Sequence, residues 1–346
     1  MIRKLCFALA LSVSSAALAA EPGKPLFAGN EVIHVSITGP ISTIASRAQD
    51  STAPQAATIS SGSAADTYPI MISARGHARR NTEVCQFPPL RVDFTRAPAE
   101  PSLFRGQKRL KLVTHCRQPA GFQQHLLLEY AAYRLYQVLS PIGFRARLTT
   151  VDYIDTKGRS PMTRLGFFLE DASDAARRAG MYEIKTGDRI SVSQLNPREA
   201  ARVAMFEYML GNLDWSTRAG AAGTGCCHNA KLIGSTKASN SNLSPIPYDF
   251  DYSGFVDAPY AIPPEGIPVS TVKRRFYRGW CVHNGQAIAI AAEMRGQRGA
   301  VLAVLGQIPQ MDERTRRGAA NYLEGFFKDI ATDQDVTAKL LKTCIH

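Results

Sequence analysis

The hydrophobic pattern of this chain changes from an alternating one to a helical one near its middle. Alternating apolar runs, typical of β-strands, occupy residues 31–36, 69–76, 89–96, 103–116, 145–155 and 164–171. Within this half, apolar residues recur at helical spacing only over 122–140, where one helix is expected. Because the strands come before most of the helices, the order favours an α+β fold with a mostly antiparallel sheet in the first half.

The second half is expected to be helical. The residues Asn-Pro-Arg-Glu at 196–199 form a helix start, with Asn196 as the cap, and Gly211 ends that helix. Further helices are expected over 284–305, 312–330 and 333–343. The predicted organisation is an N-terminal strand with a flexible segment over 21–66 (a linker or mobile loop from 48), a β-rich part with one helix over 67–171, and a helical part over 172–346.

The first 20 residues are typical of a signal peptide. Arg3 and Lys4 precede a short apolar run, and Ala17–Ala19 supplies a small-residue cleavage site near Ala19 or Ala20. The run is shorter than the ~20 residues that span a bilayer, and no later segment is long and apolar enough. We therefore expect an exported protein, periplasmic or secreted, with no transmembrane segment in the mature chain.

Removal of residues 1–20 takes Cys6 with it and leaves six of the seven cysteines, which an oxidising compartment allows to pair. Cys85 and Cys116 flank one β unit, so a disulfide between them is expected. An alternative for Cys226, Cys227 and His228 is a zinc site, although the chain lacks the C-x-x-C spacing typical of one.

The adjacent residues Cys226 and Cys227 are not expected to bond to each other. Each is expected to reach either Cys281 or Cys344, which would give three disulfides in all.

Three short motifs in the second half carry oxygen ligands and acids. Asp214 lies in GNLDW directly after a helix end, and Asn229 opens a hairpin in CHNAKLI. Asp249 and Asp251 alternate in PIPYDFDYSGF at the far end of that hairpin. Carboxylate and amide oxygens suit Mg²⁺. One Asp that orients a hydroxyl, with an Asn and an Asp that hold metal, is the arrangement used for phosphoryl transfer.

Lysines and one glutamate in the first half complete this interpretation. Lys108 and Lys111 lie on a predicted strand, and Glu129 lies on the following helix among apolar residues. A carboxylate in such surroundings needs a partner, and a lysine paired with it would hold nucleotide phosphates.

The ordered motifs ISARGHAR, RGQKRLKL, LLLEYAAYRLY, GFFLED, GNLDWS, HNAKLI and PYDFDYSG resemble those of the CotH-type (spore coat protein H-like) atypical kinases and, more distantly, the HipA-type kinases. The resemblance covers about residues 69–260. It implies a protein-kinase-like two-lobed fold, with a β-rich N-lobe and a helical C-lobe around ATP and Mg²⁺ (or Mn²⁺).

The resemblance also implies roles for individual residues. The catalytic set would be Asp214, Lys111, which contacts the phosphates, and Glu129, which pairs with that lysine. Lys108 would be the alternative phosphate contact, Glu170 would lie near the adenine, and Arg75, Gly76, His77 and Arg79 would lie in the loop over the phosphates. Asn229, Asp249 and Asp251 would be the metal ligands.

The chain departs from typical kinases in the fourteen residues between Asp214 and Asn229, where the usual gap is about four. The insertion fits the site only if Trp215 and His228 meet at its base. The leading interpretation is an exported kinase that transfers a phosphoryl group from ATP to a protein Ser/Thr or another hydroxyl, with an unknown protein or cell-envelope acceptor. The alternative is an inactive binding or envelope-assembly module.

A nucleic-acid binder ranks last among these interpretations. The formal net charge of +12 is its only support, because aromatic residues are not interleaved with the basic runs. The charge is concentrated instead near Arg75, Lys108 and Lys111, where it suits a small polyphosphate.

Overall fold

A computed structural model describes residues 23–62 and 66–346, and the predicted signal peptide lies outside these ranges. The first half forms seven strands, whose bounds are β1 Ile33–Gly39, β2 Gln55–Ser60, β3 Thr67–Ala74, β4 Leu90–Phe94, β5 Arg109–Val113, β6 Ala146–Asp155 and β7 Met162–Leu169. They close into a barrel in the order β1-β2-β3-β4-β5-β7-β6. All neighbours are antiparallel except β1 and β6, which pair in parallel from Ile33 with Thr149 to Gly39 with Asp155.

This closed barrel shows that the predicted protein-kinase-like two-lobed fold is wrong. The N-terminal half is not an open β-rich lobe, because β1 pairs with β6 and removes the free edges of the sheet. The coarser prediction of a mixed α+β chain with mainly antiparallel strands is confirmed. Strand β2 arises within the segment expected to be a linker or mobile loop from residue 48 onward.

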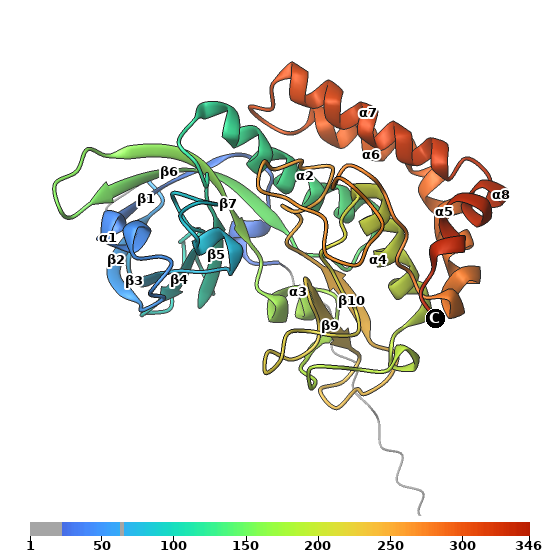
Figure 1. The fold of residues 1–346 in the computed structure, drawn as a ribbon. Helices are drawn as coiled ribbons and strands as arrows, with labels where there is room; N and C mark the ends of the chain where they lie inside the picture. Colours follow the sequence, from blue (N-terminus) through green and yellow to red (C-terminus); the bar gives the residue numbers. More distant parts are fainter. Residues whose placement is uncertain (1–22, 63–65) are drawn as a thin grey trace, which may run out of the picture.

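The helices lie mainly beside and above the barrel, as Figure 1 shows. Their bounds are α1 Ile41–Ser46, α2 Gln123–Leu139, α3 Ala172–Arg178, α4 Pro197–Leu210, α5 Asn284–Gly296, α6 Arg298–Gly306, α7 Glu313–Asp329 and α8 Asp333–Asp335. The three short strands β8 Tyr182–Ile184, β9 Ala230–Gly234 and β10 Ser244–Pro247 form a second sheet in the order β10-β9-β8. No helix of the described residues is long and apolar enough to cross a membrane.

Local sequence explains the helix that leads into the candidate site. Asn196 accepts a hydrogen bond from the Glu199 amide at 2.9 Å and caps α4, and Pro197 occupies the first turn. At the other end, Gly211 has φ of +62°, a left-handed conformation that glycine adopts without steric cost. The predicted start and end of this helix are therefore both confirmed, and Asp214 lies three residues after the cap residue Gly211.

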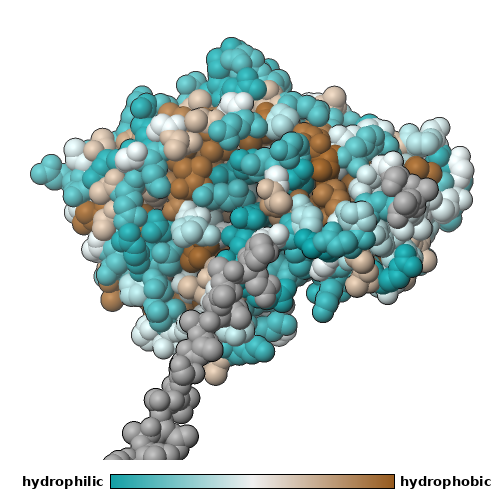
Figure 2. Space-filling model, turned by 180° about the vertical axis from the view of Figure 1, so that it is seen from behind, coloured by the Kyte–Doolittle hydropathy of each residue, from teal (hydrophilic) through white to brown (hydrophobic). Residues whose placement is uncertain are grey.

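Two hydrophobic clusters make up most of the core. One fills the barrel around Ile37, Val92 and Phe104, and the other joins α2, α4 and the C-terminal helices around Tyr130, Phe206 and Phe326. On the face that Figure 2 shows, hydrophobic residues gather in separate areas among hydrophilic ones. The candidate site lies where the barrel, α2 and the small sheet meet.

Three disulfides are present among the described residues. Cys85 bonds to Cys116, which confirms that prediction. The predicted partners of Cys226 and Cys227 are wrong, because these two residues bond to each other across a cis peptide bond, with their Cα atoms 3.0 Å apart.

Cys281 and Cys344 bond to each other instead. Backbone pairing explains why: the Cys281 amide donates to the Ile345 carbonyl at 2.9 Å, so the end of the chain lies directly beside Cys281.

Candidate functional site

A cleft of about 470 Å³ brings together residues that are far apart in the sequence. It is lined by Arg75, Gly76, His77, Ala78, Arg79, Pro89, Asp214, His228, Asn229, Asp249, Asp251, Tyr252 and the segment Ile262–Glu265. Eight of the twelve residues given a role in the sequence analysis line this cleft: Arg75, Gly76, His77, Arg79, Asp214, Asn229, Asp249 and Asp251. The other four, Lys108, Lys111, Glu129 and Glu170, do not line it, although Glu129 contacts the lining residue Arg79.

The hairpin β9–β10 places Asn229 beside Asp249. Asn229 directly precedes β9, Asp249 follows β10 by two residues, and the Tyr248 amide donates to the Asn229 carbonyl at 3.0 Å. Both Asn229 and Asp249 have left-handed backbone conformations, with φ of +50° and +67°. Asn and Asp tolerate this region better than most residues, which explains why they can turn their side chains into the cleft at the base of the hairpin.

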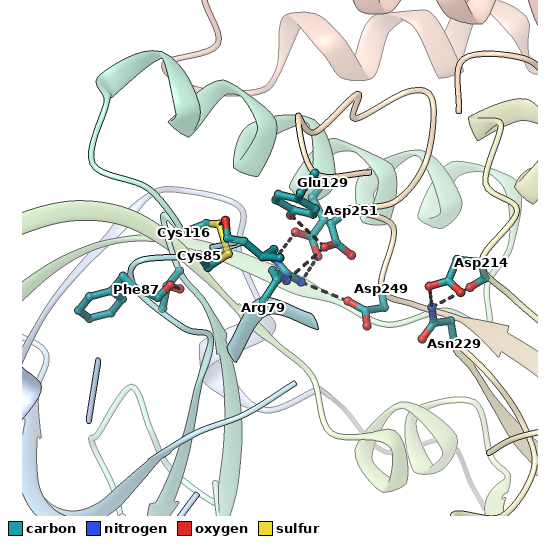
Figure 3. A network of polar contacts seen from close by, with 12 residues as sticks. Arg79, Cys85, Phe87, Cys116, Glu129, Asp214, Asn229, Asp249 and Asp251 are labelled. Atoms are coloured by element: carbon teal, nitrogen blue, oxygen red, sulfur yellow. Dashed lines mark hydrogen bonds and ion pairs between the residues drawn. A yellow bond between two sulfur atoms is a disulfide. The ribbon is translucent and has the colours of Figure 1, made fainter. Parts of the chain in front are cut away.

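Asp214 is held by two neighbouring side chains. Its Oδ1 lies 2.7 Å from His228 Nε2, and its Oδ2 accepts from Asn229 Nδ2 at 3.1 Å. The hydrogen bond that the protonated His228 ring donates to Asp214 raises the pKa of His228 above its usual value of about 6.5. We refer to Asp214, His228 and Asn229 as the Asp214 cluster. Figure 3 shows Asp214 and Asn229 side by side, with Asp249 between them and Arg79.

The insertion after Asp214 is looped out of the cleft. Ser216 and His228 pair as an isolated antiparallel bridge, with the two backbone hydrogen bonds at 2.9 and 3.1 Å. The fourteen residues between Asp214 and Asn229 therefore leave and return at almost the same place. The departure from the spacing of typical kinases does not separate Asp214 from Asn229.

The second half of the cleft is a buried ion cluster centred on Arg79. The guanidinium lies 3.0 Å from Glu129, 3.1 Å from Asp249 and 3.2 Å from Asp251. Burial opposes the charge of Arg79, but these carboxylates raise its pKa well above the usual value, so it stays protonated. Burial also raises the pKa of Asp251 to about 8. We refer to Arg79, Glu129, Asp249 and Asp251 as the Arg79 cluster (Figure 3).

The sequence analysis assigned Arg79 to a loop over the phosphates and paired Glu129 with a lysine. In the structure Arg79 takes the place of that lysine as the partner of Glu129. It lies in a short turn, Ala78–Arg80, between β3 and β4, and the Cys85–Cys116 disulfide fixes the chain just beyond it. The only sequence signal for this pairing was a glutamate on a buried helix that needed a cationic partner.

The acid groups of the Arg79 cluster are close enough to hold a metal ion. Ligand atoms of Glu129, Asp249 and Asp251 lie within 4.8 Å of one another. The Arg79 guanidinium, however, already neutralises this triad. Asn229 and Asp249 suit Mg²⁺ better, because the Asn229 amide nitrogen is committed to Asp214, which leaves its oxygen available. Asp249 is also the most exposed acid of the cluster, at 36%.

Two lysines lie over the Tyr248 ring beside Asp249, and the charge of Arg75 also acts on this tyrosine. Lys111 Nζ lies 4.9 Å and Lys231 Nζ 5.6 Å from the ring centroid. Burial, together with the charges of Arg75 and Lys231, lowers the pKa of Lys111 to about 8. We refer to Arg75, Lys111 and Lys231 as the cation group. The sequence analysis missed Lys231, although its place two residues after Asn229 on β9 was a usable signal.

The remaining predicted residues take no part in the cleft. Lys108 is exposed before β5, and its carbonyl accepts from the Phe94 amide. Glu170 is 2% exposed and binds Arg178 at 2.9 Å and the Arg145 amide at 3.0 Å. Its carboxylate is therefore already used within the protein.

The geometry places acids, an amide oxygen and several cations around one cleft. A comparison of the chain with protein-family models and with curated proteins found no match.

Proposed function

We propose that this cleft binds the polyphosphate of a nucleotide such as ATP, with Mg²⁺ or Mn²⁺, and transfers the terminal phosphoryl group to a hydroxyl acceptor. The observation that carries the proposal is the cation group next to Asp249 and the Asp214 cluster. A lysine surrounded by cations and largely withdrawn from water is stabilised by an incoming anion. The resemblance of the motif order to that of the CotH-type kinases supports the same activity.

Each residue has a defined part in the proposed reaction. Arg75, Lys111 and Lys231 bind the phosphate oxygens, while Asp249 and Asn229 would hold the metal ion, which neutralises phosphate charge when bound. The acceptor oxygen forms a bond to the terminal phosphorus as the bond to the bridging oxygen breaks. The proton of the hydroxyl passes to Asp214, and the products are a phosphate ester and a nucleoside diphosphate.

The Asp214 cluster suits the task of orienting an acceptor. The Asp214 side chain is 35% exposed to the cleft, and two hydrogen bonds fix it without covering it. An exported protein acting on a Ser/Thr hydroxyl of a protein or on a cell-envelope molecule would meet its acceptor at this open side. Ile262, 70% exposed, lies on the segment that lines the same opening.

One observation favours the alternative of a binding module without transfer. Arg79 occupies the acid triad as a built-in cation, so Asp251 and Glu129 are not open to a metal ion in this arrangement. A cleft of this kind would bind a nucleotide or another polyphosphate and leave it intact.

The test is transfer of labelled phosphate from ATP with Mg²⁺ or Mn²⁺, to the protein itself or to a generic protein acceptor. We expect wild-type activity, its loss in Asp214→Asn, and no change in the matched surface variant Lys108→Met. ATP binding without transfer by the wild type would support the binding module and contradict the enzyme. The absence of any shift in melting temperature with ATP and metal would contradict both.

A further inference from the structure

The loop that carries Asp214 rests on a buried pair of polar side chains. Asn212 Nδ2 donates to Glu207 Oε2 at 2.9 Å, and Asn212 Oδ1 accepts from the Asp214 amide at 3.0 Å. The Asn212 carbonyl also accepts from the Trp215 indole at 3.1 Å. Asn212 therefore fixes both residues that follow Leu213, and Glu207 fixes Asn212.

Glu207 and Asn212 are both completely buried, at 0% exposed. Glu207 belongs to α4, which ends at Leu210, so it connects a rigid helix to the loop beyond Gly211. Leaving a buried polar group without its partner costs about 1–3 kcal/mol of folding stability. The Glu207–Asn212 hydrogen bond therefore holds the two side chains together in one arrangement.

The charged groups that act on Glu207 are Asp214 and Arg278, and Arg278 donates to the Trp215 carbonyl at 3.3 Å. Burial raises the pKa of Glu207 to about 8, so the carboxyl group is mostly neutral at pH 7. A neutral Glu207 beneath Asp214 does not repel that carboxylate, whereas an ionised Glu207 would.

We infer that Glu207 is a positioning residue, which sets the place of Asp214 through Asn212 without contacting the cleft. Its importance for catalysis rests on the proposed function, but the positioning itself does not. A displacement of a reacting group by about 1 Å costs about a hundredfold in rate. The pair Glu207–Asn212 is the connection that would prevent such a displacement.

The hydrogen bond between Asp214 and His228 reports the position of the loop independently of activity. The test is the pKa of His228, followed by NMR in wild type, Glu207→Gln and Glu207→Leu, with the signal assigned by its loss in His228→Gln. We expect a raised pKa in the wild type and in Glu207→Gln, whose amide oxygen still accepts from Asn212. In Glu207→Leu the pKa should fall toward about 6.5.

An unchanged His228 pKa in a folded Glu207→Leu protein would overturn the inference. If Glu207→Leu does not fold, Asn212→Ala is used instead. It removes the hydrogen bond to Glu207 and the one from the Asp214 amide, so the pKa of His228 should again fall toward about 6.5.

The activity assay then separates this inference from the proposed function. If the wild type transfers phosphate, Glu207→Leu should lose about a hundredfold in kcat with little change in KM for ATP, and Glu207→Gln should rescue most of the loss. If the wild type transfers nothing, the proposed function fails while the His228 titration still decides the role of Glu207. Equal losses in the Gln and Leu variants would contradict the positioning role.

Discussion

The two sides of the cleft differ in how much of their charge is exposed to water. In the Arg79 cluster the side chains of Arg79, Glu129 and Asp251 are 8%, 3% and 6% exposed, and each is paired. In the Asp214 cluster, Asp214 and His228 are 35% and 48% exposed. Buried ion pairs are costly to break, whereas exposed ones contribute little to stability. The Arg79 cluster should therefore determine folding, and the Asp214 cluster should mainly determine chemistry.

The largest effect is expected from Arg79→Ala. This change leaves the buried carboxylates of Glu129 and Asp251 without a counter-charge, so the free energy of unfolding should fall by about 3–5 kcal/mol. Urea denaturation measures it. The matched control is Arg80→Ala, which removes hydrogen bonds to the Gly76 and Ala48 carbonyls and should cost about 1 kcal/mol. Equal losses in the two variants would contradict a special role for Arg79.

The loss in Arg79→Ala should also depend on pH. Without the guanidinium the buried acids keep raised pKa values, so protonation at low pH relieves the unpaired charge. Because the pKa of Asp251 is about 8 beside Arg79 and rises further without it, the destabilisation relative to wild type should be largest above pH 8 and should shrink as the pH falls toward 7. A loss that grows at low pH would show that the acids are not the cause.

The disulfide on the Arg79 side should stabilise the fold more than the disulfide on the Asp214 side. Cys85–Cys116 closes a sequence separation of 31 residues on the Arg79 side, and Cys226–Cys227 joins neighbours on the Asp214 side. From loop entropy, the double Ser variant of the first pair should lose about 3–4 kcal/mol and that of the second about 1 kcal/mol. Chemical denaturation under matched buffer conditions compares them. A reversed order would show that the short disulfide stabilises the fold by another route.

Lys111→Met is expected to weaken the binding of ATP without metal by about tenfold, or 1.4 kcal/mol. Because the pKa of Lys111 is about 8, the wild-type affinity should also fall as the pH rises above 8, when the lysine loses its charge. Lys108→Met is the control, and it should keep both the affinity and the pH dependence. Calorimetric titration at pH 7 and 9 measures them, and a pH dependence that survives in Lys111→Met would exclude this lysine as its cause.

The smallest effect is expected from His228→Gln. The folded-state pKa of His228 is raised, so its stabilisation is present in full below about pH 6.5 and is lost as the pH rises through the folded value. Because the side chain is 48% exposed, the gain should stay under about 1 kcal/mol. Thermal unfolding at pH 5.5 and 8.5 should show a difference between wild type and variant at the lower pH only. A larger difference between wild type and variant at pH 8.5 than at pH 5.5 would show that protonated His228 is not the source of the stabilisation.

Local signals predicted the elements that position the site. The cap at Asn196, the left-handed Gly211 and the apolar spacing of α2 all depend on neighbouring residues, which the sequence shows directly. Strand β2 was missed because Gln55–Ser60 consists mainly of Ala, Thr and Ser and has little alternation. Closure of the barrel was missed because β1 and β6 are about a hundred residues apart, and no local pattern specifies their parallel pairing.

Within the site, too, local contacts could be predicted from the sequence and long-range contacts could not. Motif order predicted that Asp214, Asn229 and Asp249 would meet, since the hairpin between the latter two is local. Arg79 is 50 residues from Glu129 and 170 from Asp249, so its pairing depends on tertiary structure. The sequence could show that Glu129 needed a cation but not which of several nearby cations would reach it.

Because Ser216 and His228 pair at its base, the length of the inserted loop does not affect the geometry of the site. Asp188, which lies before α4 in the sequence, accepts hydrogen bonds from the amides of Gly223 and Gly225 and so fixes the tip of the loop. A foreign segment grafted between 219 and 224 would therefore lengthen the chain without moving Asp214 from Asn229. The length and sequence of this loop can therefore vary without any change in the side chains that line the cleft.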